Sequence, residues 1–547
     1  MAGTWQGLTN QPAFNTSTMI LLTDGRVMVQ EEAQKHWHAL TPDSNGSYVA
    51  GTWSTLADMS FWRRYYASGV LKDGRVIVIG GEQSGDVGDT TKGEIYDPVS
   101  DSWSPIVSPP GWSTVGDAAS TILPDGRLMI GALYPSTACA IYDPATNSWT
   151  PAASKAVTSN EEGWVLLPDN TIVTTQCWDP YQTEKYIIST DTWKNEGALS
   201  VRIVDPLMHE MGPGMLMYNH KVIFFGSANE RGHGKTVIYT PPAFPTGTGT
   251  WVAGPDIPAI GKQAIVCNDC PASLMPNGKV LFAAANFLIN DWGSPVLLFE
   301  YDPASNTIAQ APTPPNNAMF PYVQYPALYW SRMMLLPSGQ VLFSASSPNV
   351  QCYTPDGGPH EAWRPTISAV VPHGSPVTDY LLKGTQLNGL SQANLYGDDC
   401  SPATNYPIVR LRNTLTTKVY FCRTYNFSTL GVATGASLQS TRFKTPNIPY
   451  GDYDLCVIAN GISSHCVSFC HRKPEKPCCH DMKKRDTCCC CHDDPCEADD
   501  RVSNPEVAEL RDQLKRLQNS MSRLAAVVRG EVVPGQPKET RDQEEKG

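Results

Sequence analysis

Residues 71–79 read LKDGRVIVI, and residues 96–103 read YDPVSDSW. An apolar run meets an Asp-Gly turn and leaves as a second apolar run, which is typical of two short strands joined by a hairpin. The same phrase returns as LPDGRL at 123–128 and YDPATNSW at 142–149. A repeat of roughly 45–60 residues, built of short strands and turns, predicts a β-propeller, in which functional groups gather on the central axis.

The number of turns predicts the number of blades. Turns that tolerate positive φ angles recur seven times, at Asp24-Gly25, Asp73-Gly74, Asp125-Gly126, Asp169-Asn170, Asn219-His220, Asn277-Gly278 and Ser338-Gly339. The outer strand of each unit should carry an aromatic or apolar residue, at Trp53, Trp103, Trp149, Trp193, Trp251, Ile308 and Trp363. We therefore expect seven blades over residues 1–364, with these tryptophans and the Tyr-Asp-Pro segments serving packing and turns.

Trp5 indicates an additional outer strand, because no turn precedes it. Such an N-terminal strand could complete the last blade and close the ring, which would protect both open sheet edges.

The repeat pattern ends at Pro365, and shorter predicted strands follow it. They cover about 100 residues, which is the size of an immunoglobulin-like β-sandwich. The predicted fold is all-β, a seven-bladed Kelch-type propeller followed by this sandwich over 365–466. A cysteine- and histidine-rich collar is expected over 467–502, and a disordered polar tail over 531–547. Between them, a short coiled-coil helix over 503–530 is predicted from apolar residues spaced three and four apart, namely Val507, Leu510, Leu514, Leu517, Met521, Leu524 and Val528.

Composition limits the possible partners. The chain has a formal net charge of −12, which disfavours nonspecific binding to nucleic acid. No apolar run approaches the length of a membrane span. The first residues, MAGTW, have neither the basic nor the apolar region of a signal peptide, so either export uses another route or a leader was removed before this numbering.

A seven-bladed Kelch-type propeller followed by an immunoglobulin-like domain resembles the galactose oxidase and glyoxal oxidase family of copper radical oxidases. Several segments sharpen this resemblance over residues 1–470: RYY at 64–66, LYWS at 328–331, GTQLNG at 384–389 and ANG at 459–461. The resemblance implies one copper ion on the propeller axis. Its ligands would be a tyrosine cross-linked to a cysteine, a second tyrosine followed by histidine, and a histidine of the C-terminal domain. It also favours an extracellular or surface location.

Counting from the turns assigns these ligand positions to residues of this chain. Tyr65 and Tyr329 match the two tyrosines. Thr16 stands where the cysteine belongs, Trp330 where histidine should follow the second tyrosine, and Tyr425 where the last histidine belongs. Two phenols with a pKa of about 10 and no imidazole make a poor Cu(II) site near neutral pH.

The sequence therefore supports two hypotheses. One is a binding or structural protein that keeps the oxidase scaffold without copper, with a propeller face for a glycan or protein ligand, and with oligomers formed through the tail. The other is a copper radical oxidase with a rearranged site, acting on aldehydes or primary alcohols with dioxygen. The substituted ligand positions favour the first, and copper is not expected.

The cysteine-rich collar could bind zinc, form disulfides or hold free thiols. Nine of the 17 cysteines lie between residues 466 and 496, far more than chance would place there. Four thiolate or imidazole ligands suit tetrahedral zinc, whereas crowded cysteines also favour a disulfide framework. The candidate ligands are Cys466, Cys470, His471, Cys478, Cys479, His480, Cys488, Cys489, Cys490, Cys491, His492 and Cys496.

Two smaller motifs have mainly structural interpretations. His36 and His38 could meet on one face of a strand, but two ligands alone make a weak metal site. Cys267 and Cys270 form a Cys-x-x-Cys motif with no second cysteine pair. We therefore expect a local disulfide or two free thiols rather than half of a metal site.

Overall fold

The computed structural model describes residues 3–82, 90–160, 162–227, 232–287, 296–314, 328–374, 377, 379–392 and 405–472. The regular elements of these residues are β-strands and short 3-10 helices, as the all-β prediction requires. None of the helices within these ranges is long and apolar enough to cross a membrane.

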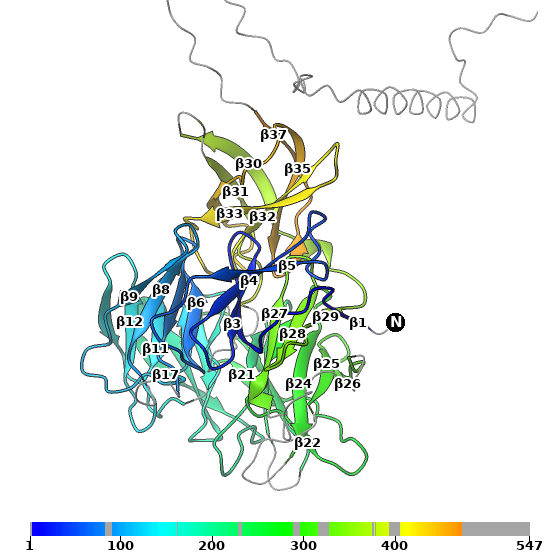
Figure 1. The fold of residues 1–547 in the computed structure, drawn as a ribbon. Coiled ribbons are helices and arrows are strands. Elements are labelled where there is room, and N and C mark those ends of the chain that lie inside the picture. The colour runs from blue at the N-terminus through cyan, green and yellow to red at the C-terminus, as the bar shows by residue number, and fades with distance from the viewer. Residues whose placement is uncertain are drawn as a thin grey trace, which may run out of the picture. The chain divides into compact units, whose positions relative to one another are not determined.

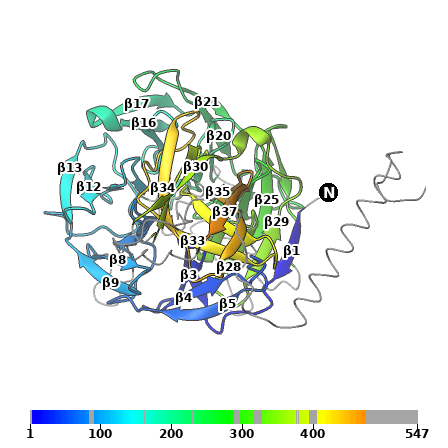
Figure 2. The same cartoon turned by 90° about the horizontal axis from the view of Figure 1, so that it is seen from above.

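The described strands form seven blades of four or five strands, which confirms the seven-bladed propeller (Figure 2). The first three blades are β2 (Thr16–Leu21), β3 (Val27–Glu31), β4 (Trp37–Thr41) and β5 (Thr52–Leu56); β6 (Ala67–Val70), β7 (Val76–Ile79), β8 (Gly93–Asp97) and β9 (Ser102–Ile106); and β10 (Ser120–Ile122), β11 (Leu128–Gly131), β12 (Cys139–Asp143) and β13 (Ser148–Ala152). The fourth and fifth blades are β14 (Val165–Leu166), β15 (Thr171–Thr175), β16 (Gln182–Ile187) and β17 (Thr192–Ala198); and β18 (Gly214–Leu216), β19 (Val222–Phe225), β20 (Thr236–Thr240) and β21 (Thr250–Ala253). The sixth and seventh blades are β22 (Ile265–Val266), β23 (Ala272–Leu274), β24 (Val280–Asn286), β25 (Leu297–Asp302) and β26 (Thr307–Gln310); and β27 (Ser331–Leu335), β28 (Val341–Ala345), β29 (Gln351–Thr354) and β1 (Thr4–Gly7).

The N-terminal strand closes the ring. β1 pairs antiparallel with β29, so Trp5 lies in the outer strand of the seventh blade as expected, opposite Tyr353. The assignment of Trp363 to that outer strand is wrong, because β1 already occupies the position. Trp363 instead ends a 3-10 helix, η4 (Glu361–Trp363), and its ring packs against Tyr218 at 4.7 Å.

The region around the Tyr-Asp-Pro segment of the second blade joins this blade to the first. In the second blade, Tyr96 donates a hydrogen bond of 2.8 Å to the carboxylate of Asp101, which also accepts one of 2.9 Å from the backbone N–H of Ala57 in the preceding blade. Trp103 donates its indole N–H to the Ala57 carbonyl, at 2.9 Å. Asp101 has a φ of 49°, a conformation that Asp and Asn tolerate better than most residues. These contacts confirm the structural interpretation of the repeated tyrosine and tryptophan.

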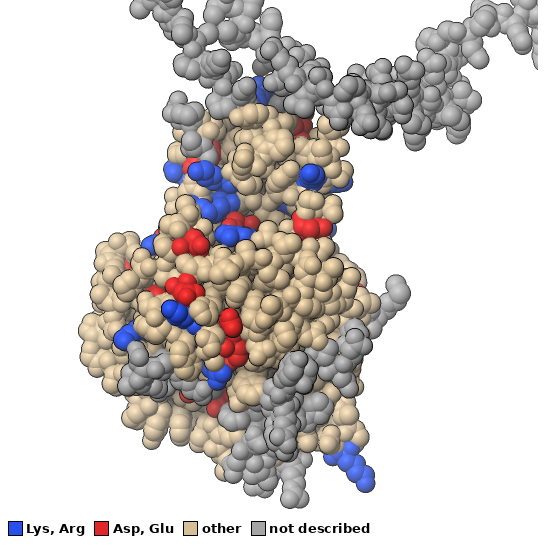
Figure 3. Space-filling model, viewed as in Figure 1, with Lys and Arg blue, Asp and Glu red and all other residues tan. Residues whose placement is uncertain are grey.

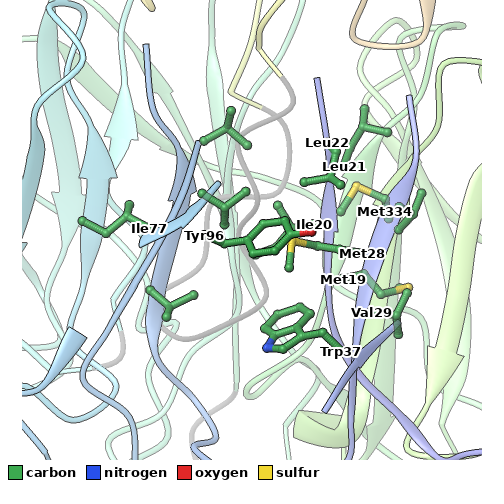
Figure 4. Packing of buried hydrophobic residues seen from close by; sticks show 14 of the residues in the cluster. Met19, Ile20, Leu21, Leu22, Met28, Val29, Trp37, Ile77, Tyr96 and Met334 are labelled. Carbon is green, nitrogen blue, oxygen red and sulfur yellow. The ribbon is translucent and has the colours of Figure 1, made fainter. Parts of the chain in front are cut away.

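The hydrophobic core lies within and between the blades. Figure 4 shows Met19, Met28 and Trp37 of the first blade packed beside Ile77 and Tyr96 of the second. All five side chains are at most 2% exposed. Burial of this kind contributes roughly 25 cal/mol per Å² of apolar surface, so it stabilises the contact between neighbouring blades.

An eight-stranded sheet follows the propeller and curls over its own core. Tyr380 and Phe469 lie on strands far apart in the sheet order, yet their ring centres are 4.8 Å apart, so the sheet folds as a sandwich does. Its strands are β30 (Thr366–His373), β31 (Asp379–Thr385), β32 (Ile408–Asn413), β33 (Val419–Tyr425), β34 (Leu438–Lys444), β35 (Gly451–Ala459), β36 (Ile462–Ser463) and β37 (Val467–His471). Because β37 pairs with β35, the sandwich continues five residues beyond the predicted boundary at 466.

The sandwich contacts the face of the propeller that carries the hairpin turns (Figure 1). The backbone N–H of Thr424 bonds to the Thr23 carbonyl at 3.2 Å, and that of Leu430 bonds to Pro124 at 2.8 Å. Tyr406, fully buried, donates its hydroxyl to the Leu21 carbonyl. Residues 473–547, which contain the rest of the collar, the predicted coiled coil and the tail, lie outside the described residues.

Candidate functional site

Two tyrosines meet where the innermost strands of the propeller begin. Tyr65 comes two residues before β6, and Tyr329 lies in the 3-10 helix η3 (Leu328–Trp330), which leads into β27. Their ring centres are 5.8 Å apart and the rings are nearly perpendicular, at 84°, a favourable arrangement for aromatic pairs. Tyr65 is 8% exposed and has a φ of 48°, which is uncommon for a residue other than glycine. The structure thus brings together the two phenols that the sequence aligned.

A buried arginine joins this pair. The guanidinium carbon of Arg332 lies 5.9 Å from the centre of the Tyr65 ring, within the range of a cation–π contact. Its Nη1 donates to the carbonyls of Tyr329 and, at 2.9 Å, Ser331. Arg332 is 3% exposed, so its positive charge lies among the aromatic rings in a poorly solvated place.

Trp330 also contributes an aromatic ring to this group. Its ring centre is 5.6 Å from that of Tyr329, again in an edge-on arrangement. Tyr65, Tyr329, Trp330 and Arg332, which we call the axial aromatic cluster, come from the starts of β6 in the second blade and β27 in the seventh blade. Both starts lie at the opposite strand ends from the hairpin turns, so the cluster belongs to the propeller face away from the sandwich.

The other two aligned positions have different surroundings. Thr16 is fully buried and donates its hydroxyl to the Ser347 carbonyl at 2.9 Å, between the first and seventh blades. Tyr425 lies on β33 of the sandwich, where its hydroxyl donates to the Asp379 carboxylate and its ring lies 4.4 Å below the guanidinium of Arg423. Burial and then the hydrogen bond to Asp379 raise the pKa of Tyr425 to about 12.

Sequence reasoning missed a set of buried acids at the same strand starts. Asp117, Glu210 and Asp269 are 4%, 7% and 3% exposed. Burial, and then the negative charges of these three residues, raise the pKa of the Cys177 thiol. The signal was present in the turns, because Asp117 and Asp269 each stand eight residues before the first turn residue, as Tyr65 does. The residues between the strands therefore supply acids as well as phenols.

The two histidines of the first blade have separate partners. His36 Nδ1 lies 2.8 Å from the Asp58 carboxylate, and His38 lies 3.5 Å from the Glu31 carboxylate while stacking on Phe14. Burial lowers the pKa of His38. Within the described ranges, no group of three or more His, Cys, Asp or Glu side chains could hold a metal ion.

Several of the cysteines considered as metal ligands form disulfides instead. Cys267 and Cys270 are joined in a local disulfide, which confirms the structural interpretation of that motif. Cys466 is joined to Cys456, so it is no longer a thiolate ligand candidate, and Cys470 is also disulfide-bonded. His471 ends β37 and stacks on Tyr450, with ring centres 5.1 Å apart. The remaining candidates lie outside the described residues: Cys478, Cys479, His480, Cys488, Cys489, Cys490, Cys491, His492 and Cys496.

Comparison with known proteins finds a family motif and similar solved structures. A family described as the Kelch motif matches residues 63–110, which contain the second blade. No curated protein matches the sequence. Among solved structures, the chain is similar to a fungal alcohol oxidase of the AA5 family in complex with copper, at 14% sequence identity and a TM-score of 0.49. That alignment covers 86% of this chain and 99% of the oxidase.

The blades and the Kelch match define a Kelch-type β-propeller protein with a β-sandwich after the propeller. A propeller followed by a sandwich is the architecture that the sequence resemblance to the galactose oxidase and glyoxal oxidase family predicts.

Proposed function

We propose that this chain is a non-catalytic binding or structural protein, built on a galactose-oxidase-like propeller and sandwich. Its recognition surface is a face of the propeller, which would take a glycan or a protein. The cysteine-rich collar and the coiled coil that follow the sandwich would join several copies into a homo-oligomer.

The observation that carries this proposal is the set of side chains at the aligned ligand positions. Copper in this fold family needs imidazoles, whereas the aligned positions here hold Thr16, Trp330 and Tyr425. A guanidinium already lies over the Tyr65 ring and is hydrogen-bonded to neighbouring carbonyls. The donor set therefore does not fit a copper ion.

An extracellular or cell-surface location fits the same proposal. Two disulfides join described cysteines, and disulfides persist in oxidising environments. In the collar, further disulfides or zinc would each hold the segment in place before the predicted coiled coil, and a metal and thiol count on purified protein separates the two.

An oxidase assay on copper-supplemented protein tests the absence of catalysis. Full-length protein, incubated with Cu(II) and dioxygen, should release no peroxide from primary alcohols or from aldehydes. The matched variant is Tyr65→Phe, which removes the phenol and keeps the ring. Peroxide release by the wild type that the Tyr65→Phe variant loses would overturn the proposal and support the oxidase.

A further inference from the structure

The outer surface of the sandwich sheet carries a row of positive side chains, which we call the cationic face: Lys383, Arg423, Arg442 and Lys444. The strands β31, β34 and β33, which carry these residues, are adjacent in the sheet. Register places Arg442 between Leu381 and Tyr425, and places Lys444 opposite Arg423. Figure 3 shows Lys and Arg side chains on the visible surface of the sandwich.

Alternation along the strands puts these four side chains on one surface. The neighbouring residues Tyr380, Leu382, Cys422 and Phe443 all belong to the core of the sandwich, so the residues between them point outward. The hydrogen bond between Tyr425 and Asp379 spans β34 on this outer surface and confirms the alternation. By standard sheet dimensions, Lys383, Arg442 and Arg423 follow a diagonal with steps of roughly 8 Å.

The positive charges of this face are not neutralised by ion pairs with the described residues. None of the four cations forms a salt bridge there, whereas Arg26, Arg75 and Arg127 of the propeller each pair with the aspartate of their own turn. Lys444 is exposed, and Lys383, Arg423 and Arg442 are partly exposed. An unpaired cationic surface on a chain with a net charge of −12 indicates a partner that is locally anionic.

An aromatic ring in the row narrows the choice of partner. Tyr425 is partly exposed, and its ring lies beside Arg423 with Arg442 directly opposite across the strand pair. A flat ring packs against the apolar face of a sugar, while the surrounding guanidinium groups bind carboxylates or sulfates in two-pronged pairs. Nucleic acid fits less well, because the rest of the molecule is acidic and would repel a densely charged strand.

We propose that the cationic face is a binding site for an acidic polysaccharide that carries carboxylate or sulfate groups. This site lies on the sandwich, away from the axial aromatic cluster. The proposal of a polysaccharide site therefore does not depend on the proposed function.

The first test measures binding of full-length protein to polygalacturonate, dextran sulfate and uncharged dextran. We expect binding to one or both anionic polymers, with an affinity that falls as salt is added, and no binding to dextran. Polygalacturonate binding alone identifies the carboxylate, and dextran sulfate binding alone identifies the sulfate. Equal binding to all three polymers, or binding to none, would overturn the proposal.

Variants locate the binding site. The double change Arg423→Gln and Arg442→Gln should weaken binding roughly tenfold or more, because two charge-assisted contacts are lost. The matched control, Lys221→Gln with Lys262→Gln, removes the same charge from exposed positions of the propeller and should leave the affinity unchanged. A thermal unfolding curve shows whether each variant is folded. Equal weakening by both double variants would contradict a defined site.

Two further arms exclude other occupants. Single-stranded DNA should bind more weakly than the preferred polysaccharide, and equal or tighter binding would contradict the choice of a sugar polymer. The chain itself holds an acidic segment at residues 493–500, DDPCEADD. Full-length protein with these five acids changed to amides should bind the polysaccharide as before. A marked gain in affinity would show that this segment occupies the face, which would overturn the proposal.

Discussion

At the scale of single residues, Arg332 explains why the two phenols are held as they are. Its guanidinium donates to the carbonyls of Tyr329 and Ser331 and lies over the Tyr65 ring, so it fixes the start of β27 against the start of β6. Buried charges are tolerated when such hydrogen bonds satisfy them. The axial aromatic cluster is therefore interpreted as a group of packed rings that the Arg332 charge holds in place.

The change Arg332→Met should lower the free energy of unfolding by roughly 2–4 kcal/mol, because the buried Ser331 carbonyl and the partly buried Tyr329 carbonyl lose a charged donor. Denaturant unfolding measures this loss. The control is Arg127→Met, which removes an exposed ion pair with Asp125 and should cost at most about 1 kcal/mol. An Arg332→Met variant as stable as the wild type would contradict a structural role for this charge.

At the scale of elements, one hydrogen bond recurs in four of the blades. Tyr96, Tyr142, Tyr186 and Tyr301 each donate a hydrogen bond to an Asp or Asn five residues later. The acceptors Asp101, Asn147, Asp191 and Asn306 all have φ between 49° and 54°. Because Asn occupies this place in two of these blades, the conformation and the acceptor oxygen matter more than the negative charge.

Changing Asp101 separates these contributions. Asp101→Asn should cost less than about 1 kcal/mol, whereas Asp101→Ala should cost roughly 2–3 kcal/mol, since it removes the acceptor for both Tyr96 and Ala57 and adds strain at positive φ. Chemical denaturation of the two variants side by side gives both values. Equal costs for the two changes would show that the acceptor oxygen does not hold the blades together.

Much of the fold could be predicted from the sequence, because the turns and the alternating strands are local signals. The seven turns indicated seven blades, and Trp5 indicated the closing strand. Trp363 was misassigned because sequence alone cannot show which of two tryptophans completes a sheet formed by the first and last segments of the propeller. The acids Asp117, Glu210 and Asp269 and the charge of Arg332 were missed because burial and proximity across blades are tertiary properties.

At the scale of the whole molecule, the buried tyrosines predict sensitivity to alkali. Burial raises the pKa of Tyr142 and of Tyr301 to about 12, whereas an unfolded tyrosine has a pKa of about 10. A folded-state pKa above the unfolded value contributes stability below the unfolded pKa, and this contribution is lost as pH rises from about 10 to 12.

The midpoint of denaturant unfolding should therefore fall over this range, and tyrosinate absorbance should appear together with unfolding. Ionisation of all tyrosines near pH 10 in a protein that keeps its full stability would contradict the expected burial.

The predicted coiled coil over residues 503–530 leads us to expect an oligomer. Light scattering of full-length protein should give a mass above that of one chain, and changing Leu510, Leu517 and Leu524 to Ser should lower it, because these residues lie in the predicted apolar seam. Non-reducing gels show whether disulfides between chains persist in this variant. A wild-type protein with the mass of one chain in light scattering and on non-reducing gels would refute assembly through the tail.

We propose that the propeller axis has a galactose-oxidase-like scaffold without a copper site. Copper titration of full-length protein, followed by visible and electron paramagnetic resonance spectra, tests it most directly, with Tyr65→Phe as the matched control. Any bound copper should give the same spectra in both proteins, because the cysteine-rich segment and not the axial aromatic cluster would hold it. A tyrosinate-to-copper charge-transfer band, at one copper per chain and lost in Tyr65→Phe, would show instead that Tyr65 binds copper at the axis.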